Sequence, residues 1–243
     1  MKDKANDKQI TLKIQRFNKD KDPKPHFKNY KIKIRGGETV LDTLIKIKET
    51  VDGTLTFRRS CRSAICGSCA VRLNGKAMLA CNTQVKDILP KNGVIEIEPL
   101  KHFNLIKDLV VDLEPFIENL RKAKPWLVKD FSKIPESGEF RVYHSDDLYN
   151  LDKIYQCTLC AVCHSDCMVL DKDGSFLSPA SIVKSYRFIL DSRDATRDGR
   201  IQELIELGIL KCDKPEKCQV ECPKGFSESK DVIQKVKKLA QRG

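Results

Sequence analysis

Eleven cysteines in a chain of 243 residues are the side chains with the clearest chemical potential. They lie in three tight groups: Cys61, Cys66, Cys69 and Cys81; then Cys157, Cys160, Cys163 and Cys167; then Cys212, Cys218 and Cys222. An odd count, with no export signal at the N-terminus, argues against a disulfide framework. Thiols that recur at short intervals are typical of metal ligands, so the sequence predicts metal centres.

The first group has the spacing Cys61-x4-Cys66-x2-Cys69-x11-Cys81, which is typical of a plant-type [2Fe–2S] cluster. Such a cluster needs a tight loop that presents three thiolates, with the fourth delivered from a separate strand. Gly67 and the small residues Ser63, Ala64, Ser68 and Ala70 would let backbone N–H groups approach the cluster sulfides, and hydrogen bonds to the sulfurs help to set the reduction potential. Zinc is the alternative, but zinc sites usually use paired C-x2-4-C hooks.

The second and third groups belong together. The second has the C-x2-C-x2-C-x3-C run of bacterial ferredoxins, in which the fourth cysteine ligates the other cluster. The third group is the same run without its second cysteine, and Pro215 stands in that place. Exchanging the last cysteines predicts a [4Fe–4S] cluster on Cys157, Cys160, Cys163 and Cys222. The same exchange leaves a [3Fe–4S] cluster on Cys167, Cys212 and Cys218, so that all eleven cysteines are used.

A zinc ribbon would show pairs of hooks instead of interlocking runs that end in Cys-Pro. Histidines add no further ligand set. Of the four, His26, His102, His144 and His164, only His164 lies within a cysteine run. We expect it to be a hydrogen-bond donor or a surface residue and not a ligand. The sequence shows no acid–base or nucleophilic constellation, so we expect no catalytic residue in this chain.

The N-terminal half predicts a small mixed sheet crossed by one helix. Alternating apolar and polar residues indicate strands, and apolar residues at helical spacing indicate the helix. The predicted elements are strands over 9–17 and 30–36, a helix over 38–51, a hairpin over 71–79 and a strand over 93–100. Asn74-Gly75 is a typical hairpin turn, and the polar stretch 18–29 is predicted to be a loop. This order predicts a β-grasp arrangement.

After about residue 105 the pattern becomes helical. Predicted helices cover 108–123, 178–192, 198–210 and 227–241, several of them beginning at Ser or Asp, and 120–140 reads as a connector. The predicted fold class is therefore α+β. A plant-type [2Fe–2S] ferredoxin domain over 1–110 precedes an all-α, bacterial ferredoxin-like domain over 111–243 that carries the [4Fe–4S] and [3Fe–4S] clusters.

Charge and hydropathy limit the possible partners. The formal net charge is +11, with 40% hydrophobic and 33% charged residues. Three clusters of roughly −2 each would lower that net charge to about +5. A zinc-binding nucleic-acid protein would need aromatic or Arg-rich recognition elements beside its cysteines, and 7% aromatics with none gathered there offers little. No run reaches the eighteen apolar residues of a membrane span, so we expect any membrane contact to go through a partner.

Several stretches together resemble the iron–sulfur subunit of succinate dehydrogenase and fumarate reductase. They are RRSCRSAICGSCAVRLNGKAMLAC, KDLVVDLEPF, YQCTLCAVC, SYRFILDSRDATRDGR and CQVECPKGF, and the agreement runs from about residue 9 to about residue 230. The resemblance implies electron transfer between a FAD-containing flavoprotein subunit, which acts on succinate or fumarate, and a quinone-linked membrane partner. It also implies a peripheral position on the inner (cytoplasmic) membrane, at its cytoplasmic face.

Two features depart from that family. The succinate-oxidising members usually have Pro and then a tryptophan-containing segment after the cysteine that corresponds to Cys167, whereas this chain continues with Met168–Ser178. The only tryptophan is Trp126, which we expect to be an anchoring apolar residue. Phe176 is the only aromatic residue in the segment, so we expect electrons to leave through a docked partner with its own redox centre. That partner would be a cysteine-rich quinone-linked subunit or a membrane anchor.

A second hypothesis is an iron–sulfur subunit that serves another flavoprotein oxidoreductase, such as a hydroxy-acid oxidase. The stretch YRFILDSRD and the single incomplete cysteine run count against it.

Overall fold

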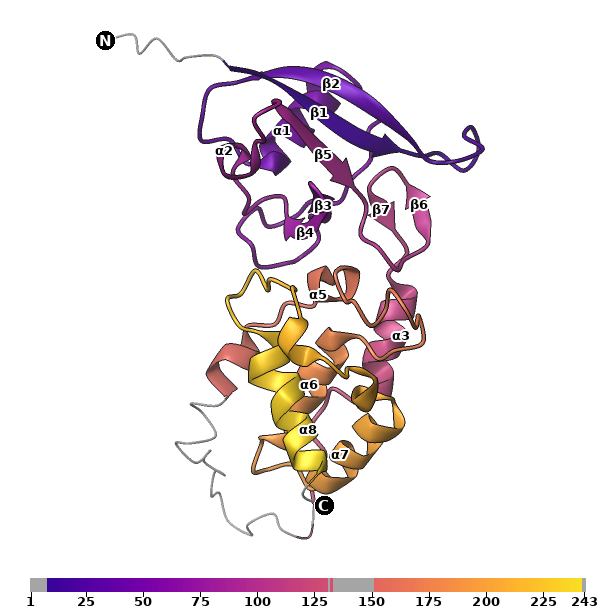
Figure 1. The fold of residues 1–243 in the computed structure, drawn as a ribbon, viewed down its shortest axis with the longest axis vertical. Coiled ribbons are helices and arrows are strands. Elements are labelled where there is room, and N and C mark those ends of the chain that lie inside the picture. The colour runs from indigo at the N-terminus through magenta and orange to yellow at the C-terminus, as the bar shows by residue number, and fades with distance from the viewer. Residues whose placement is uncertain (1–7, 131, 133–150, 242–243) are drawn as a thin grey trace, which may run out of the picture. The chain divides into compact units, whose positions relative to one another are not determined.

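The structure is a computed structural model that describes residues 8–130, 132 and 151–241. The chain divides into two compact units, and each is considered by itself (Figure 1). The first unit comprises Met1–Leu113 together with Cys160–Asp166, and the second comprises Glu114–Leu159 together with Cys167–Gly243.

A five-stranded sheet forms the first unit, in the order β2-β1-β5-β3-β4. Its strands are β1 (Lys8–Arg16), β2 (His26–Ile34), β3 (Ala70–Leu73), β4 (Lys76–Leu79) and β5 (Val94–Glu98). The sheet is mixed, because β1 runs parallel to β5 and antiparallel to β2. Alternate residues of β1, namely Ile10, Leu12 and Ile14, are almost fully buried, which is the period-two pattern of a half-buried strand.

Helix α1 (Val40–Thr50) lies against this sheet (Figure 1). Thr39 caps its N-terminus: the hydroxyl accepts from Asp42 N at 3.2 Å, and the Asp42 carboxylate accepts from Thr39 N at 2.9 Å. This reciprocal box satisfies two of the free N–H groups at the helix start. Leu41, Leu44 and Ile47 are buried on the face toward the sheet. The N-terminal mixed sheet with a helix packed on it is therefore confirmed, although the unit also contains two short helices.

The hairpin between β3 and β4 turns at Asn74-Gly75, as expected. Asn74 has φ 49° and Gly75 has φ 85°. Two successive positive φ values are those of a type I′ turn, whose twist matches the flanking strands.

Strand β2 begins earlier in the chain than the sequence indicated. The predicted loop over 18–29 is too long, because the strand starts at His26, which pairs with Arg16. Residues His26 to Asn29 are all exposed, and only Phe27 among them is apolar, so the apolar alternation that marks a strand is missing there. Backbone pairing with β1 extends the strand regardless of the side chains.

The predicted helix over 108–123 is wrong in its first six residues. A short hairpin of β6 (Leu105–Lys107) and β7 (Val110–Val111) occupies its start, and helix α3 covers only Glu114–Lys122. Asp108 takes a left-handed backbone conformation (φ 49°), which ends any helix at that point. Two adjacent β-branched valines favour the strand.

Asp108 is also the centre of a buried polar network. Its carboxylate is almost fully buried and accepts from Arg16 Nε at 2.9 Å, from Phe17 N at 3.0 Å and from Thr56 N at 2.8 Å. Arg16 also donates to Asp52 at 2.8 Å and to Tyr30. Burial opposes the charge of Arg16, yet its hydrogen bond to Asp108 and the charge of that carboxylate hold the pKa above its usual range. The network ties the end of β1 to the segment that leads into the first cysteine group.

Helices make up the regular elements of the second unit in the residues that the structure describes. They include α3, α6 (Pro179–Ile189), α7 (Arg197–Glu206) and α8 (Gln234–Ala240), helical residues 151–155, the 3-10 turns η2 (Ile209–Lys211) and η3 (Pro215–Lys217) and a π-helical turn η4 (Glu228–Ile233). Phe176, Ile182, Leu204 and Val232 belong to their common core. The short helices α2 (Val85–Ile88) and α5 (Val162–Ser165) lie in the first unit.

Two predicted helices of this unit differ in detail. The helix predicted over 198–210 ends at Glu206, because Gly208 adopts φ 92° and starts a separate turn. The helix predicted over 227–241 begins as the π-helical turn η4, in which Ser227 accepts from Lys230 N at 3.1 Å. An extra residue per turn leaves no mark in the apolar spacing of so short a segment.

The expectation that Trp126 anchors the connector through its side chain is wrong. Its indole is 51% exposed. The backbone is held instead, because the buried Arg200 side chain donates to Trp126 O at 2.7 Å and to Lys124 O at 2.8 Å. Arg200 is paired with Asp194 at 2.7 Å. Residues 131 and 133–140 of the predicted connector lie outside the described residues.

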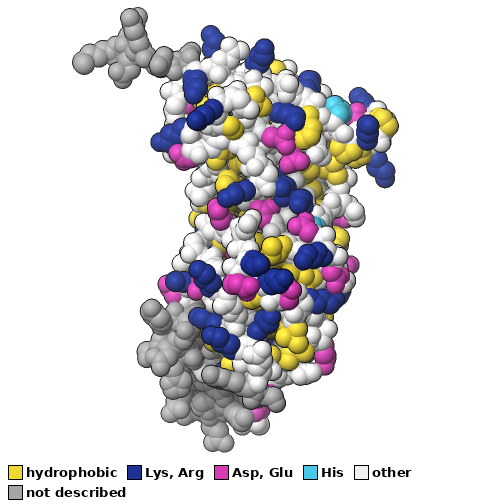
Figure 2. Space-filling view, in the orientation of Figure 1, with side chains coloured by type: hydrophobic (Ala, Val, Ile, Leu, Met, Phe, Trp, Pro, Cys, Tyr) yellow, Lys and Arg dark blue, Asp and Glu magenta, His cyan; other side chains and the backbone are white. Residues whose placement is uncertain are grey.

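Across the residues that the structure describes, every helix is too short or too polar to cross a bilayer. Figure 2 shows Lys and Arg side chains scattered over the visible face of both units, interspersed with Asp and Glu. On this face the excess positive charge forms no single basic patch.

Candidate metal centres

The first cysteine group forms a loop whose backbone N–H groups converge on a sulfur atom. Cys61 Sγ accepts from Cys66 N at 3.2 Å and from Ser63 N and Ile65 N at 3.4 Å each. These bonds lower the pKa of the Cys61 thiol to about 6, since they stabilise its thiolate. Arg62 (φ 56°) and Ala64 (φ 57°) both adopt left-handed conformations, which turn the amides inward.

The other sulfurs of the group receive N–H groups as well. Ala64 N donates to Cys81 Sγ and Cys81 N donates to Cys69 Sγ, each at 3.4 Å. Cys81 follows β4, so its thiol comes from a separate strand as expected. Cys69 is buried, which raises the pKa of its thiol to about 12 in the absence of metal.

This donor set suits a thiolate-ligated cluster. Amide N–H groups aimed at sulfur stabilise the negative charge of the thiolates, and they are one means by which a protein sets a cluster potential. In this loop the N–H groups of Ser63 and Ala64, two of the small residues, reach cysteine sulfurs, whereas their approach to the sulfides of a cluster stays a prediction. Cys61 and Cys66 are exposed, whereas Cys69 is buried, so the loop lies at the surface of its unit.

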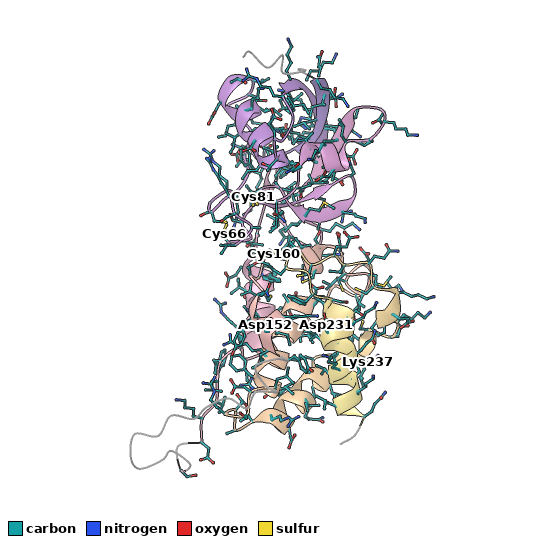
Figure 3. The ribbon with its side chains drawn as sticks, turned by 90° about the vertical axis from the view of Figure 1, so that its left-hand side faces the viewer. Cys66, Cys81, Asp152, Cys160, Asp231 and Lys237 are labelled. Carbon is teal, nitrogen blue, oxygen red and sulfur yellow. The ribbon has the colours of Figure 1, made fainter. Side chains whose placement is uncertain are left out.

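Segment Cys160–Asp166 packs within the first unit although it lies some fifty residues beyond Leu113. The Asp166 carboxylate accepts from Arg72 Nη1 at 2.8 Å and from Ala77 N at 2.7 Å. Ser165 Oγ accepts from Lys101 N at 3.0 Å. Cys160 and Cys163 are thus carried by the unit that holds the first group, and Cys66, Cys81 and Cys160 lie at the same end of it (Figure 3).

His164 is neither a surface residue nor part of a ligand group. It is 5% exposed, and its ring packs against Phe103 with centroids 4.6 Å apart. Burial, followed by the charge of nearby His102, lowers the pKa of His164 to about 4, so the ring is neutral at physiological pH. Of the two roles expected for His164, the structure excludes a surface residue and supports a hydrogen-bonding residue, because the ring is buried and bonded to the backbone of His102. His144 lies outside the described residues.

The second unit gathers the three cysteines predicted to hold three irons. Cys167 and Cys212 are buried in the core of this unit. Burial raises the pKa of each of these thiols, to about 11 for Cys212, and the negative charges of Cys167 and Cys218 raise that of Cys212 further. The charge of Cys218 thus affects both Cys167 and Cys212, and the charge of Cys167 affects Cys212.

Cys157 and Cys222 pack against the same core. Cys157 is the more informative of the two, because Lys184 Nζ donates to its backbone carbonyl at 2.8 Å. Burial raises the pKa of the Cys157 thiol, and the charge of Lys184 opposes that shift. A second lysine repeats the arrangement: Lys237 Nζ donates to Cys212 O at 2.7 Å. Neither lysine could be singled out from the sequence, since the chain has 45 Lys and Arg residues and nothing local marks these two.

All eleven cysteines are free of disulfide bonds. Within residues 8–130, 132 and 151–241, no three Cys, His, Asp or Glu side chains converge on one point as ligands of a single ion would. Phe176, the only aromatic residue of segment 168–178, is fully buried in the core. Met168, by contrast, is 40% exposed.

Comparison with known proteins agrees with the cysteine geometry. A family model described as a 2Fe-2S iron-sulfur cluster binding domain matches residues 11–118. The mitochondrial succinate dehydrogenase [ubiquinone] iron-sulfur subunit of Dictyostelium discoideum is 35% identical over 230 residues, which are 92% of this chain and 80% of that protein. The corresponding subunit of Candida glabrata is 37% identical over 234 residues, 95% of this chain and 91% of that protein.

The chain belongs to the succinate dehydrogenase iron–sulfur subunit family. A chain of the Mycobacterium smegmatis Sdh1 complex in the apo form has the same fold, with a TM-score of 0.84, 22% identity and 97% of each chain covered. The family resemblance read from the cysteine groups is therefore confirmed, and with it iron–sulfur chemistry and an electron-transfer role in an oxidoreductase. The region that matches the 2Fe-2S cluster binding domain, residues 11–118, includes the first cysteine group of this succinate dehydrogenase iron–sulfur subunit family member.

Proposed function

We propose that this chain is the electron-transfer subunit of a succinate dehydrogenase or fumarate reductase. The observation that carries the proposal is the set of backbone N–H groups directed at Cys61, Cys69 and Cys81, in a chain with two further cysteine groups. When bound, iron–sulfur clusters accept and release single electrons at potentials set by cluster type, burial and hydrogen bonds to sulfur. The residues described here supply thiolates, amide donors and burial.

The cysteines are assigned to three centres by their spacing. Cys61, Cys66, Cys69 and Cys81 would hold [2Fe–2S]; Cys157, Cys160, Cys163 and Cys222 would hold [4Fe–4S]; Cys167, Cys212 and Cys218 would hold [3Fe–4S]. The mutual electrostatic influence of Cys167, Cys212 and Cys218 supports the last set.

The fold is assigned in the same terms. A β-grasp, plant-type ferredoxin domain over about residues 1–110 would be followed by a bacterial ferredoxin-like helical domain over 111–243. The parallel pairing of β1 with β5 beside the antiparallel β1–β2 and β3–β4 pairs supports the first part. The helices around Cys167 and Cys212 support the second.

Two partners follow from this role. A FAD-containing flavoprotein subunit would exchange electrons with succinate or fumarate, and a membrane anchor or cysteine-rich quinone-linked subunit would connect to quinone. We place the chain at the cytoplasmic face of the inner membrane through that second partner. The burial of Phe176 removes the one aromatic side chain of segment 168–178 from its surface, which favours exit through a docked partner with its own redox centre.

Iron analysis tests the proposal. Protein purified anaerobically should contain about nine irons per chain, the sum expected for two-, four- and three-iron clusters. It should be brown and show EPR signals of a reduced two-iron and an oxidised three-iron centre. Stoichiometric zinc with little iron would overturn the assignment.

Lys184 should tune the proposed four-iron centre. Replacing it with methionine removes a positive charge beside Cys157, so addition of an electron becomes less favourable and the reduction potential of this centre should fall. An EPR-monitored redox titration measures the shift. Lys184→Arg keeps the charge and should stay near the wild-type potential; equal potentials in all three proteins would disprove the role of this charge.

A further inference from the structure

Gly67 lies where the first cysteine loop touches the segment that carries Cys160. The glycine has φ 72°, and a Cβ at this position would lie 2.7 Å from both Cα and Cβ of Cys160 and 3.3 Å from its N atom. Ordinary carbon–carbon contacts are about 3.5–4.0 Å. The two backbones thus approach as closely as a residue without a side chain allows.

The residues on each side of this contact are both proposed cluster ligands. Gly67 directly follows Cys66, a ligand of the proposed two-iron centre, and the residue that it touches is itself a ligand of the proposed four-iron centre. Both segments belong to the first unit, and Cys66 and Cys160 lie at the same end of it (Figure 3).

The segment that carries Cys160 has little freedom to yield. Asp166 binds Arg72 Nη1 and Ala77 N at 2.8 and 2.7 Å, and Ser165 binds Lys101 N at 3.0 Å. Ala161, next to Cys160, is 2% exposed and holds a left-handed conformation (φ 63°). A methyl group at Gly67 must therefore push the exposed cysteine loop away, by roughly 1 Å, to restore ordinary contact.

We propose that Gly67 is a spacing residue that fixes the separation between the two-iron centre and the Cys160 ligand of the four-iron centre. The inference rests on the proposed function, because it takes Cys66 and Cys160 to be ligands of different clusters. The absence of a side chain at Gly67 sets how near the first cysteine loop lies to the Cys160 ligand, while the thiolates and the amide donors of that loop are unchanged.

Gly67→Ala and Gly93→Ala form a matched pair for the test. Gly93 has the same φ of 72° in the same unit, but nothing lies within 4 Å of its added Cβ. Both variants therefore place a side chain at the same positive φ, and only Gly67→Ala adds the clash. The measurement is the magnetic interaction between the two reduced centres, read from the relaxation and broadening of the two-iron EPR signal in the purified, cluster-loaded protein.

We expect Gly67→Ala to keep its full iron content and to show a clearly weaker interaction, because dipolar coupling falls steeply with distance. Gly93→Ala should match wild type. An unchanged interaction in iron-replete Gly67→Ala, or an equal loss in Gly93→Ala, would overturn the inference.

If Gly67→Ala fails to take up iron, Asp166→Asn in the same chain provides the deciding variant. Weakening the anchor at Asp166 gives the Cys160 segment room to move, so iron should return together with a weakened interaction. Failure of iron to return would show that the clash is not the cause and would also overturn the inference. Absence of separate two-iron and four-iron signals in wild type would instead refute the proposed function.

Discussion

Serine in place of Cys222 is expected to remove the four-iron centre and to leave the three-iron centre in place. The result would be unexpected from sequence neighbourhood alone, because Cys222 follows Cys218 by four residues and Cys218 is assigned to the three-iron centre. The physical reason is the exchange of fourth ligands between paired cysteine runs. Iron content should fall by about four per chain, and the oxidised three-iron EPR signal should persist.

Cys167→Ser is the reciprocal variant. Cys167 follows Cys163 by four residues, but its thiol lies within electrostatic reach of Cys212 and Cys218. Here the three-iron signal should disappear while the four-iron centre remains. If each substitution instead destroyed the centre of its neighbours in the sequence, the exchanged assignment would be refuted.

Alanine in place of Asp108 should lower the free energy of unfolding by about 3–5 kcal/mol, the usual effect of removing one partner from a buried ion pair. The carboxylate accepts from Arg16 Nε, Phe17 N and Thr56 N, and all three donors would lose an acceptor. Since Thr56 begins the segment that leads to Cys61, the brown colour should also bleach faster in denaturant. Denaturant titration followed by circular dichroism and absorbance measures both effects.

Two control variants separate these causes. Asp108→Asn keeps the left-handed backbone position, which asparagine tolerates, but it removes the charge and replaces one acceptor oxygen by an NH2 group. Its amide oxygen can still accept from Arg16 Nε and Phe17 N, so the loss of unfolding free energy should be smaller than for Asp108→Ala. Glu96→Ala breaks a half-exposed ion pair with Lys13, and exposed pairs contribute at most about 1 kcal/mol. The role assigned to the network would be refuted if Asp108→Ala lowered the free energy of unfolding by no more than Glu96→Ala does.

Short-range signals predicted much of the first unit. The alternation of Ile10, Leu12 and Ile14 predicted β1, and Asn74-Gly75 predicted the hairpin, because in each case neighbouring residues determine the conformation. The helix over 108–113 failed for the opposite reason. There the backbone is governed by the contact of Asp108 with Arg16, a residue more than ninety positions earlier.

The candidate metal centres show the same contrast between what neighbouring residues determine and what long-range contacts determine. Cysteine spacing predicted the groups, and the small residues predicted that amides would approach sulfur at Cys61. Spacing could not predict that Cys160 would touch Gly67, nor that Lys184 would reach the carbonyl of Cys157. Those contacts join segments far apart in the chain, and no local periodicity encodes them.

The membership of Cys160–Asp166 in the first unit has a consequence for synthesis on the ribosome. The polypeptide leaves that unit after Leu113, returns to it at Cys160 and leaves again after Asp166. At about 5–20 residues per second, the roughly fifty residues between Leu113 and Asp166 take several seconds to translate. Until then Arg72 Nη1 and Ala77 N lack their acceptor, the Asp166 carboxylate. The N-terminal unit therefore finishes folding only when about two-thirds of the chain has been made.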